Sequence, residues 1–319
     1  SILAGQDGSD HKALRRHMVH ALSPSLVEID QIIHSELDEI IDDVKKKRKF
    51  DAVQDLAFVL PIRVLGRIIG IPRHQQEQVA RCALKLASVF SQEYISDSRT
   101  DVNDALLWLR ECISSIISQH NMSANIKSNT DNFIDRFLQA THAEWSSAHI
   151  VDNIIFLLFA GFETSLNLIA NGFDALMDFP EQQRKLREDR KLMPFAIEEF
   201  LRFNSPVHIT GRFTTEPIHV AGQRIGSGRV VYLGLASANR DPDQFHCPDV
   251  LDITRQKNPH LAFGAGPHQC LGALVARREA ILLYSRFIDE FEWFSRIGEK
   301  ERAKNATLRS LKRLPISIE

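Results

Sequence analysis

The chain has 319 residues, of which 44% are hydrophobic and 25% are charged. This is the composition of an ordinary globular protein, and it excludes the disordered and fibrous classes. The 39 lysine and arginine residues nearly balance the 41 aspartate and glutamate residues, which gives a formal net charge of −2. Without an overall positive field, we expect no nucleic acid and no anionic membrane as the main partner.

The residue pattern predicts neither a membrane anchor nor a secretory leader. The longest apolar run, residues 154–162, has nine residues, whereas a helix that spans a bilayer needs roughly 20. The four cysteines form no Cys-x-x-Cys pair, which argues against a disulfide framework and a structural zinc site. We therefore expect a reduced, cytoplasmic protein. Because the chain does not begin with methionine, we also expect residues upstream of it.

The predicted elements run from helices to a small sheet and back to a helix. Apolar residues recur at three- and four-residue steps from about residue 10 to 200, as in Ile29, Ile32, Ile33 and Leu37, and this pattern predicts amphipathic helices. Residues 218–235 are rich in β-branched residues and carry glycines at turns, which predicts a small sheet. After a long connection over residues 236–269, a helix is predicted from about 271 to 287. We expect one mainly α domain with small β-sheets over residues 1–319.

The most apolar predicted helix, residues 147–179, contains a locally unfavourable segment at 160–164. Gly161 costs about 1 kcal/mol relative to alanine in a helix, Glu163 is costly to bury, and Thr164 is a weak helix former. The Thr164 hydroxyl can also bond the carbonyl of Ala160, four residues back. Local rules broken together in a core helix suggest a functional site. Considered alone, the segment also fits a helix packed closely at Gly161 with Glu163 in solvent.

The densest pattern is the decapeptide at 263–272, Phe-Gly-Ala-Gly-Pro-His-Gln-Cys-Leu-Gly. Its glycines allow a tight turn and a close approach to a flat ligand, and the helix that follows places its positive N-terminal end near the sulfur of Cys270. Such an environment favours a thiolate, and a lone thiolate suits the axial position of a haem iron better than zinc, which needs further ligands nearby. The alternative is an inert core cysteine beside a glycine-rich turn.

This decapeptide resembles the cysteine-ligand signature of the cytochrome P-450 superfamily of haem-thiolate monooxygenases, and residues 160–164 resemble the acid–alcohol pair of that family. The resemblance implies the cytochrome P-450 fold, with the long central helix over the haem and the cysteine loop on its proximal side. It implies haem b as the cofactor and Cys270 as the ligand of its iron. In this interpretation Glu163 delivers protons and Thr164 hydrogen-bonds the activated dioxygen. The further haem-binding positions are Ala160, Gly161, Phe263, Gly264, His268 and Gly272.

Other motifs of the family lie outside these two segments. Glu199 and Arg202 match its Glu-x-x-Arg motif, which pins the cysteine loop through a third partner. In the family this third partner is usually an arginine, and Val250 stands at its position here. Whether Arg255 substitutes for that arginine is left open by the sequence. Considered alone, Glu199 and Arg202 also fit a surface ion pair.

The resemblance also implies partners for the two haem propionates. These are His11, Arg15, Arg212 and His268. The positions that resemble the lining of the substrate pocket are Phe156, Phe159, Val207 and Ile209.

The resemblance implies an enzyme that inserts one atom of dioxygen into an apolar small molecule, terpenoid or fatty-acid-like. The 319 residues contain no reductase domain, so we expect electrons from a separate ferredoxin or flavodoxin that docks near Arg277 and Arg278. Family chains normally carry several dozen more residues before the first predicted helix, so the chain resembles a soluble bacterial member shortened at its N-terminus. The alternative is a truncated haem-binding protein without monooxygenase turnover.

Overall fold

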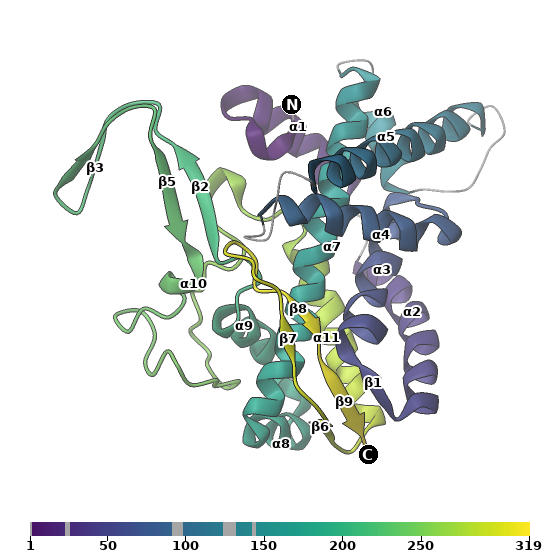
Figure 1. Ribbon diagram of the computed structural model, residues 1–319, viewed down its shortest axis with the longest axis vertical. Helices are drawn as coiled ribbons and strands as arrows, with labels where there is room; N and C mark the ends of the chain where they lie inside the picture. Colours follow the sequence, from purple (N-terminus) through teal and green to yellow (C-terminus); the bar gives the residue numbers. More distant parts are fainter. Residues whose placement is uncertain (1, 23–25, 91–97, 124–131, 142–144) are drawn as a thin grey trace.

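The computed structural model describes residues 2–22, 26–90, 98–123, 132–141 and 145–319, and most of these are helical (Figure 1). The helices are α1 (Gly8–Ala21), α2 (Leu26–Lys47), α3 (Val59–Ile69), α4 (Arg73–Ala87), α5 (Ser98–Ser123), α6 (Phe133–Thr141), α7 (Ser147–Asp178), α8 (Pro180–Glu188), α9 (Met193–Phe203), α10 (Leu235–Ala238) and α11 (Ala273–Glu290). The strands are β1 (Lys49–Asp51), β2 (Ile209–Phe213), β3 (Ile218–Val220), β4 (Gln223–Ile225), β5 (Val230–Gly234), β6 (Phe294–Arg296), β7 (Glu301–Arg302), β8 (Leu311–Arg313) and β9 (Pro315–Ile318). The predicted fold class, mainly α with small sheets, is confirmed.

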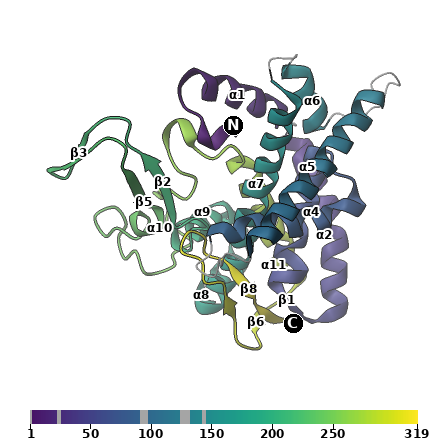
Figure 2. The same cartoon turned by 45° about the horizontal axis from the view of Figure 1, so that its top comes forward.

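Helix α7, with 32 residues, runs through the centre of the molecule (Figures 1 and 2). It packs against α3, α4, α5, α9 and α11. Ser146 caps its start, since its side chain accepts a hydrogen bond from the N–H of His149 at 3.3 Å. Ile154, Leu158 and Phe162 are almost fully buried, and burial of such a side chain contributes roughly 1.5–3 kcal/mol. This apolar packing keeps α7 in the core.

By length and composition alone, α7 could cross a membrane, which the sequence analysis did not anticipate. Its most apolar window of 18 residues has a mean hydropathy of 1.6, and 72% of that window is buried inside the protein. The surrounding helices therefore already cover most of the apolar surface of α7, as they do for a core helix.

Small antiparallel sheets join distant parts of the chain. Strand β9 lies between β1 and β6, so residues 49–51 and 294–296 both pair with the C-terminal strand. Strands β2 and β5 form a separate pair, and β3 and β4 form another; these pairs project to one side of the helices in Figure 1. The sheet begins earlier than the predicted residue 218, because β2 starts at Ile209. Strand β2 pairs with β5, and β3 and β4 lie between them in the chain. The pairing of β2 therefore leaves no local signal in the sequence.

Gly172 allows α7 to approach α9 and α11 closely. A Cβ atom at this position would lie 2.3 Å from Tyr284 Oη and 2.8 Å from Phe200 Cδ2. Tyr284 is fully buried, and its hydroxyl donates a hydrogen bond to the carbonyl of Ile169 at 2.5 Å. Tyr284 therefore cannot move aside without leaving a buried polar group unpaired.

We expect Gly172→Ala to lower the free energy of unfolding by about 1–3 kcal/mol, because the added methyl group overpacks this contact. Chemical denaturation followed by circular dichroism measures the change. Gly226→Ala is the matched control, since nothing lies within 4 Å of a Cβ atom at that position. Equal losses in the two variants would contradict the close packing at Gly172.

Candidate functional site

One face of α7 is only half-buried, and it carries most of the helix residues predicted for the site. The half-buried residues are Phe156, Phe159, Ala160, Gly161 and Thr164. Their spacing follows the helical period, so they share one face of the helix. A Cβ atom at Gly161 would lie 3.2 Å from Leu65 Cδ2, so a larger residue here would crowd the side chain of Leu65.

The hydroxyl of Thr164 bonds the backbone of its own helix. Its Oγ1 donates to the carbonyl oxygen of Ala160 at 2.7 Å, as the sequence predicted. This bond orients the side chain and uses the hydroxyl hydrogen, so the lone pairs of Oγ1 remain free to accept a hydrogen bond. Thr164 therefore presents an oriented acceptor on the half-buried face.

Glu163 is buried, with 7% of its surface exposed. Ser310 Oγ donates to its Oε1 at 3.2 Å, and no described residue bonds its Oε2. Burial raises the pKa of Glu163 to about 7, although the hydrogen bond from Ser310 acts in the opposite direction. The alternative of a solvent-exposed Glu163 is therefore wrong, and the carboxyl group can both hold and release a proton near neutral pH.

A second buried carboxyl group, that of Glu279 on α11, was missed by the sequence analysis. Glu279 is 3% exposed, and it shares a hydrogen bond with Ser165, the residue after Thr164. Burial raises the pKa of Glu279 to about 8, against the effect of that hydrogen bond. One signal in the sequence could have indicated that Glu279 is buried: it lies four residues before Leu283, on the same face of the helix, and Leu283 is buried.

The cysteine loop turns at two glycines before α11 begins. Gly264 and Gly266 have φ angles of 66° and 73°, in the left-handed region that favours glycine. The N–H of Cys270 donates to the carbonyl of Phe263 at 2.8 Å and closes the loop. In both Figures 1 and 2 this light-green segment lies between α1, β2 and α7. The loop thus meets elements from three distant parts of the sequence.

Opposing effects act on the thiol of Cys270. Burial raises its pKa, while the N–H groups of Gly272 and Ala273 and the charges of Arg15 and Arg277 act to lower it. Cys270 is exposed as a residue, yet the atoms around its sulfur desolvate the thiolate enough to raise the pKa. The predicted effect of the helix N-terminus is present, and for the thiol in this structure desolvation outweighs it.

Side chains of α1 gather against the cysteine loop. Arg15 Nη2 donates to the carbonyl of Gln269 at 2.7 Å, and the rings of His11 and His268 lie 4.2 Å apart. His268 Nε2 lies 2.9 Å from Asp7 Oδ1, so this group of donors suits a carboxylate. His11 is 2% exposed, and among the described residues its Nε2 has no hydrogen-bond partner.

Arg212 on β2 lies near this group but bends back to its own strand. Its Nη1 donates to the carbonyl of Gly211 at 2.7 Å and lies 3.3 Å from Thr210 Oγ1. The hydrogen bond from His268 lowers the pKa of Asp7, and the charge of Arg212 contributes in the same direction. The structure therefore brings His11, Arg15 and His268 to the loop and leaves Arg212 within electrostatic range.

Glu199 and Arg202 on α9 form a fully buried ion pair, not a surface pair. Arg202 donates from Nε and Nη2 to the two carboxylate oxygens of Glu199 at 2.8 and 2.7 Å, and neither side chain is exposed. Arg255 Nε also donates to Glu199, at 3.2 Å, so Arg255 does supply the guanidinium missing at Val250. The carbonyl of Val250 instead accepts from Arg202 at 3.2 Å.

The remaining predicted pocket residues lie where the chain leaves α9 for the sheet. Val207 forms an isolated β-bridge with Leu308, and Ile209 pairs with Gly234 at the start of β2. Both are half-buried, as are Phe156 and Phe159. All four predicted lining residues thus combine apolar character with accessible surface.

The two arginines expected near the docking site of a redox partner each bond a carboxylate. Arg277 forms two hydrogen bonds with Glu198, at 2.6 and 2.8 Å. Arg278 forms two with Asp30, at 2.8 and 2.5 Å. A carboxylate thus lies beside each guanidinium, and docking of a redox partner near these arginines stays a prediction.

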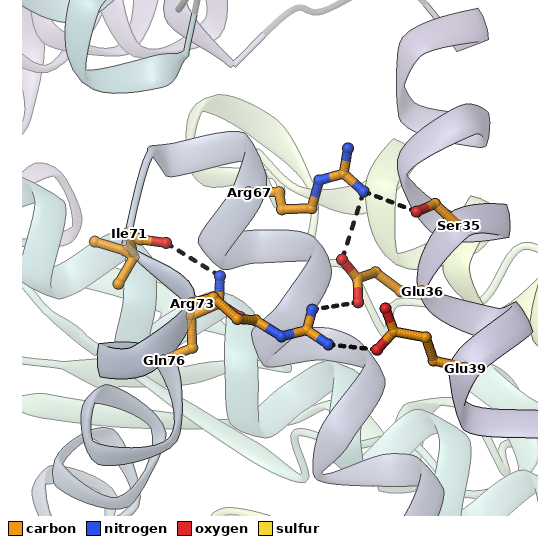
Figure 3. Close-up of a pocket in the computed structure, with 7 residues that line it drawn as sticks. All are labelled: Ser35, Glu36, Glu39, Arg67, Ile71, Arg73 and Gln76. Atoms are coloured by element: carbon orange, nitrogen blue, oxygen red, sulfur yellow. Dashed lines mark hydrogen bonds and ion pairs between the residues drawn. The ribbon is translucent and has the colours of Figure 1, made fainter. Parts of the chain in front are cut away.

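A separate pocket of about 540 Å³ opens between α2, α3 and α4 (Figure 3). Its arginines, Arg67 and Arg73, bond Glu36 and Glu39 across the pocket. None of the residues predicted for the site lines this pocket. Its charged groups satisfy one another, and we assign it a structural role.

A family model described as "Cytochrome P450" matches residues 77–318. Among curated proteins, the chain is 36% identical to "Cytochrome P450 CYP107DY1" of Priestia megaterium, over 97% of this chain and 75% of that protein. It is 33% identical to "Biotin biosynthesis cytochrome P450" of Bacillus subtilis, over 98% of this chain and 79% of that protein.

Solved structures agree with these matches. P450BioI in complex with an acyl carrier protein ligated to hexadec-9Z-enoic acid superposes with a TM-score of 0.93 at 32% identity, over 100% of this chain and 82% of that one. CYP109E1 from Bacillus megaterium in complex with testosterone has a TM-score of 0.89 at 28% identity, over 99% and 86%. The cysteine loop, the central helix and these similarities together show that the chain belongs to the cytochrome P450 family of haem-dependent monooxygenases.

Proposed function

We propose that the chain inserts one oxygen atom into a C–H or C=C bond of a hydrophobic small molecule, and that the thiolate of Cys270 would hold the iron of haem b. The observation that carries the proposal is the cysteine loop at 263–272, which meets the donors of α1 on one side and lies beside the helix that carries Glu163 and Thr164. The overall balance is one substrate, one dioxygen, two electrons and two protons, giving the oxygenated product and water.

The residues near the loop fit a haem. Cys270 is a lone thiol, and in the described part of the chain no group of His, Cys, Asp and Glu side chains is arranged to hold a metal ion by itself. The donors of His11, Arg15 and His268 suit two propionates, since a carboxylate already bonds His268. When bound, the haem supplies an iron that activates dioxygen. Gly161 keeps the backbone of α7 bare on the half-buried face.

Glu163 and Thr164 would handle the protons of the reaction. With its pKa at about 7, Glu163 is about half protonated at neutral pH, which is the condition under which one group both takes up and donates a proton efficiently. Thr164 holds Oγ1 toward the half-buried face through its bond to Ala160. We propose that protons leave Glu163 Oε2, the oxygen that no described residue bonds, and that Thr164 receives and orients them.

The substrate we propose is apolar and terpenoid or fatty-acid-like. Phe156, Phe159, Val207 and Ile209 offer apolar surface without charge, which favours hydrophobic ligands. The names of similar proteins point the same way: one structure holds hexadec-9Z-enoic acid on an acyl carrier protein, another holds testosterone, and a third relative is a vitamin D(3) 25-hydroxylase. Comparing the metabolites of cells with and without the gene by mass spectrometry would identify the substrate.

We propose that the electrons come from a separate ferredoxin or flavodoxin, as the resemblance to bacterial members of the family implies. A cytoplasmic location is supported by the four cysteines, all of which are free thiols. The alternative of a haem-binding protein without turnover gains no support, because the buried Glu163 and the oriented Thr164 are retained.

We expect Cys270→Ala to lose the spectrum of thiolate-ligated haem. In the purified wild type, the reduced carbon monoxide complex should show the red-shifted Soret band typical of thiolate ligation. The variant lacks the sulfur and should not show that band. Cys247→Ala, at an exposed cysteine outside the loop, should leave the spectrum unchanged. An unchanged spectrum in Cys270→Ala would remove Cys270 from the site.

The buried carboxyl group of Glu163 should make stability depend on pH. Its pKa rises from 4.5 to about 7 on folding, so between these values the folded state binds more protons than the unfolded state. The free energy of unfolding should therefore fall by about 3 kcal/mol as the pH rises through this range. Glu163→Gln should lack this contribution, whereas Glu279 titrates in both proteins. Urea unfolding between pH 5 and 8 measures the free energy of unfolding of both proteins, and one pKa unit corresponds to about 1.4 kcal/mol. If this free energy depends on pH in the same way in wild type and variant, the raised pKa does not belong to Glu163.

We expect Thr164→Ala to divert reducing equivalents from product to peroxide, because the variant loses the hydroxyl that orients proton transfer. The loss should be roughly tenfold in product per electron, below the roughly 10²–10⁴-fold that a general acid or base contributes, because Glu163 still supplies the proton. Oxygen consumption, peroxide and product are measured together. Thr164→Ser, which keeps the hydroxyl, should retain most of the product yield. Equal yields in wild type and Thr164→Ala would show that Thr164 serves only the helix.

A further inference from the structure

Glu198, the neighbour of Glu199 on α9, bonds two residues that flank the cysteine loop. Arg277 Nε donates to Glu198 Oε1 at 2.6 Å, and Arg277 Nη2 donates to Oε2 at 2.8 Å. His260 Nε2 lies 2.9 Å from the same Oε2. The N–H of Ala262 donates to His260 Nδ1, so Nε2 carries the hydrogen that Glu198 accepts. One carboxylate therefore joins α9, α11 and the chain that enters the loop.

Arg277 lies directly on the ring of Phe263, the first residue of the loop. Its Cζ is 4.4 Å from the ring centroid, a distance at which a cation and an aromatic face attract each other. The carbonyl of Phe263 accepts the N–H of Cys270 at 2.8 Å. The contacts thus form a continuous chain from Glu198 through Arg277 and Phe263 to the backbone of Cys270. The guanidinium also interacts electrostatically with the sulfur of Cys270.

We propose that Glu198 and Arg277 are positioning residues for the haem thiolate: Glu198 fixes the Arg277 guanidinium against Phe263, which holds the cysteine loop and keeps one positive charge beside Cys270. The proposal rests on the proposed role of Cys270 as axial ligand. The proposal depends on the bidentate bond between Arg277 and Glu198, because a planar guanidinium can bond a carboxylate and lie on the ring of Phe263 at the same time. A flexible ammonium group would keep the charge but not the planar contact.

Arg278 provides a matched control on the same helix. It is as exposed as Arg277, with 30% against 34% of the side chain accessible, and it also bonds a carboxylate through two nitrogens. Its partner, however, is Asp30 on α2, so this pair joins α11 to α2 without contacting Phe263. Loss of either pair removes one surface charge and one bidentate contact, but only loss of Arg277 reaches the cysteine loop.

The test compares Arg277→Gln, Arg277→Lys and Arg278→Gln as holoenzymes. The first readout is the rate at which the reduced carbon monoxide complex loses its thiolate band in mild denaturant. We expect this rate to rise roughly tenfold in Arg277→Gln, corresponding to loss of about 1.4 kcal/mol. The rate should rise less in Arg277→Lys. In Arg278→Gln it should stay within twofold of wild type, which corresponds to a change of about 0.4 kcal/mol at most.

The second readout is the reduction potential of the haem iron, which a merely structural contact does not set. A positive charge beside the thiolate favours the reduced, more negative site, so Arg277→Gln should shift the potential to more negative values, whereas Arg277→Lys should keep it near that of wild type. Failure of Arg277→Gln to retain haem, with Arg278→Gln intact, would support the inference, and Arg277→Lys then gives the graded measurement.

An unchanged potential in Arg277→Gln, or band loss no faster than in Arg278→Gln, would overturn the inference while the proposed function stands. Absence of the thiolate band in the wild type would instead overturn the role of Cys270, and the inference with it. The spectrum of the wild type therefore separates the two failures before any variant is compared.

Discussion

The buried carboxylate of Glu199 holds the part of the chain on which the cysteine loop depends. Residues 239–265 contain no helix or strand, so their backbone groups need other partners. Arg202, fixed by Glu199, donates to the carbonyls of Asn239, Pro248 and Val250. Glu199 itself also accepts from the N–H of Asp252, from Arg255 and from Asn258. A buried charge is stable only with such complete pairing, and the same pairing gives the long connection its course toward Cys270.

The acidic side chains near the cysteine loop and along α7 divide according to their partners. Glu198 has its pKa lowered to about 2, because the hydrogen bonds and charges of Arg277 and His260 outweigh desolvation. Among the described residues, the bonding partners of Glu163 and Glu279 are serine hydroxyls, and burial raises the pKa of both. The paired acid serves to hold the fold around the cysteine loop, whereas the acids without a cation can exchange protons near neutral pH. The pKa of each carboxyl group thus follows its bonding partner and not its residue type.

Local features were readable from the sequence, and long-range ones were not. The central helix was predicted at 147–179 and spans Ser147–Asp178, because its apolar period is strong. The bond from Thr164 to Ala160 joins residues within one turn, so the sequence suffices to predict it. In contrast, Arg255 reaches Glu199 across 56 positions, and Glu279 meets Ser165 only after α7 and α11 have packed together. The net effect on the Cys270 thiol was also out of reach, since desolvation depends on tertiary packing.

The two sides of the site are built from different kinds of contact. Around the cysteine loop, charged and polar groups from α1, α9 and α11 converge through short, directional bonds. On α7, the half-buried face presents apolar side chains and a single oriented hydroxyl. Directional bonds fix one geometry, because they weaken steeply with angle and distance, whereas apolar surface tolerates changes of shape. The cysteine loop is therefore held in one geometry while the apolar face of α7 can adapt, which fits a family whose solved structures here are in complex with molecules as unlike as a fatty acyl chain and a steroid.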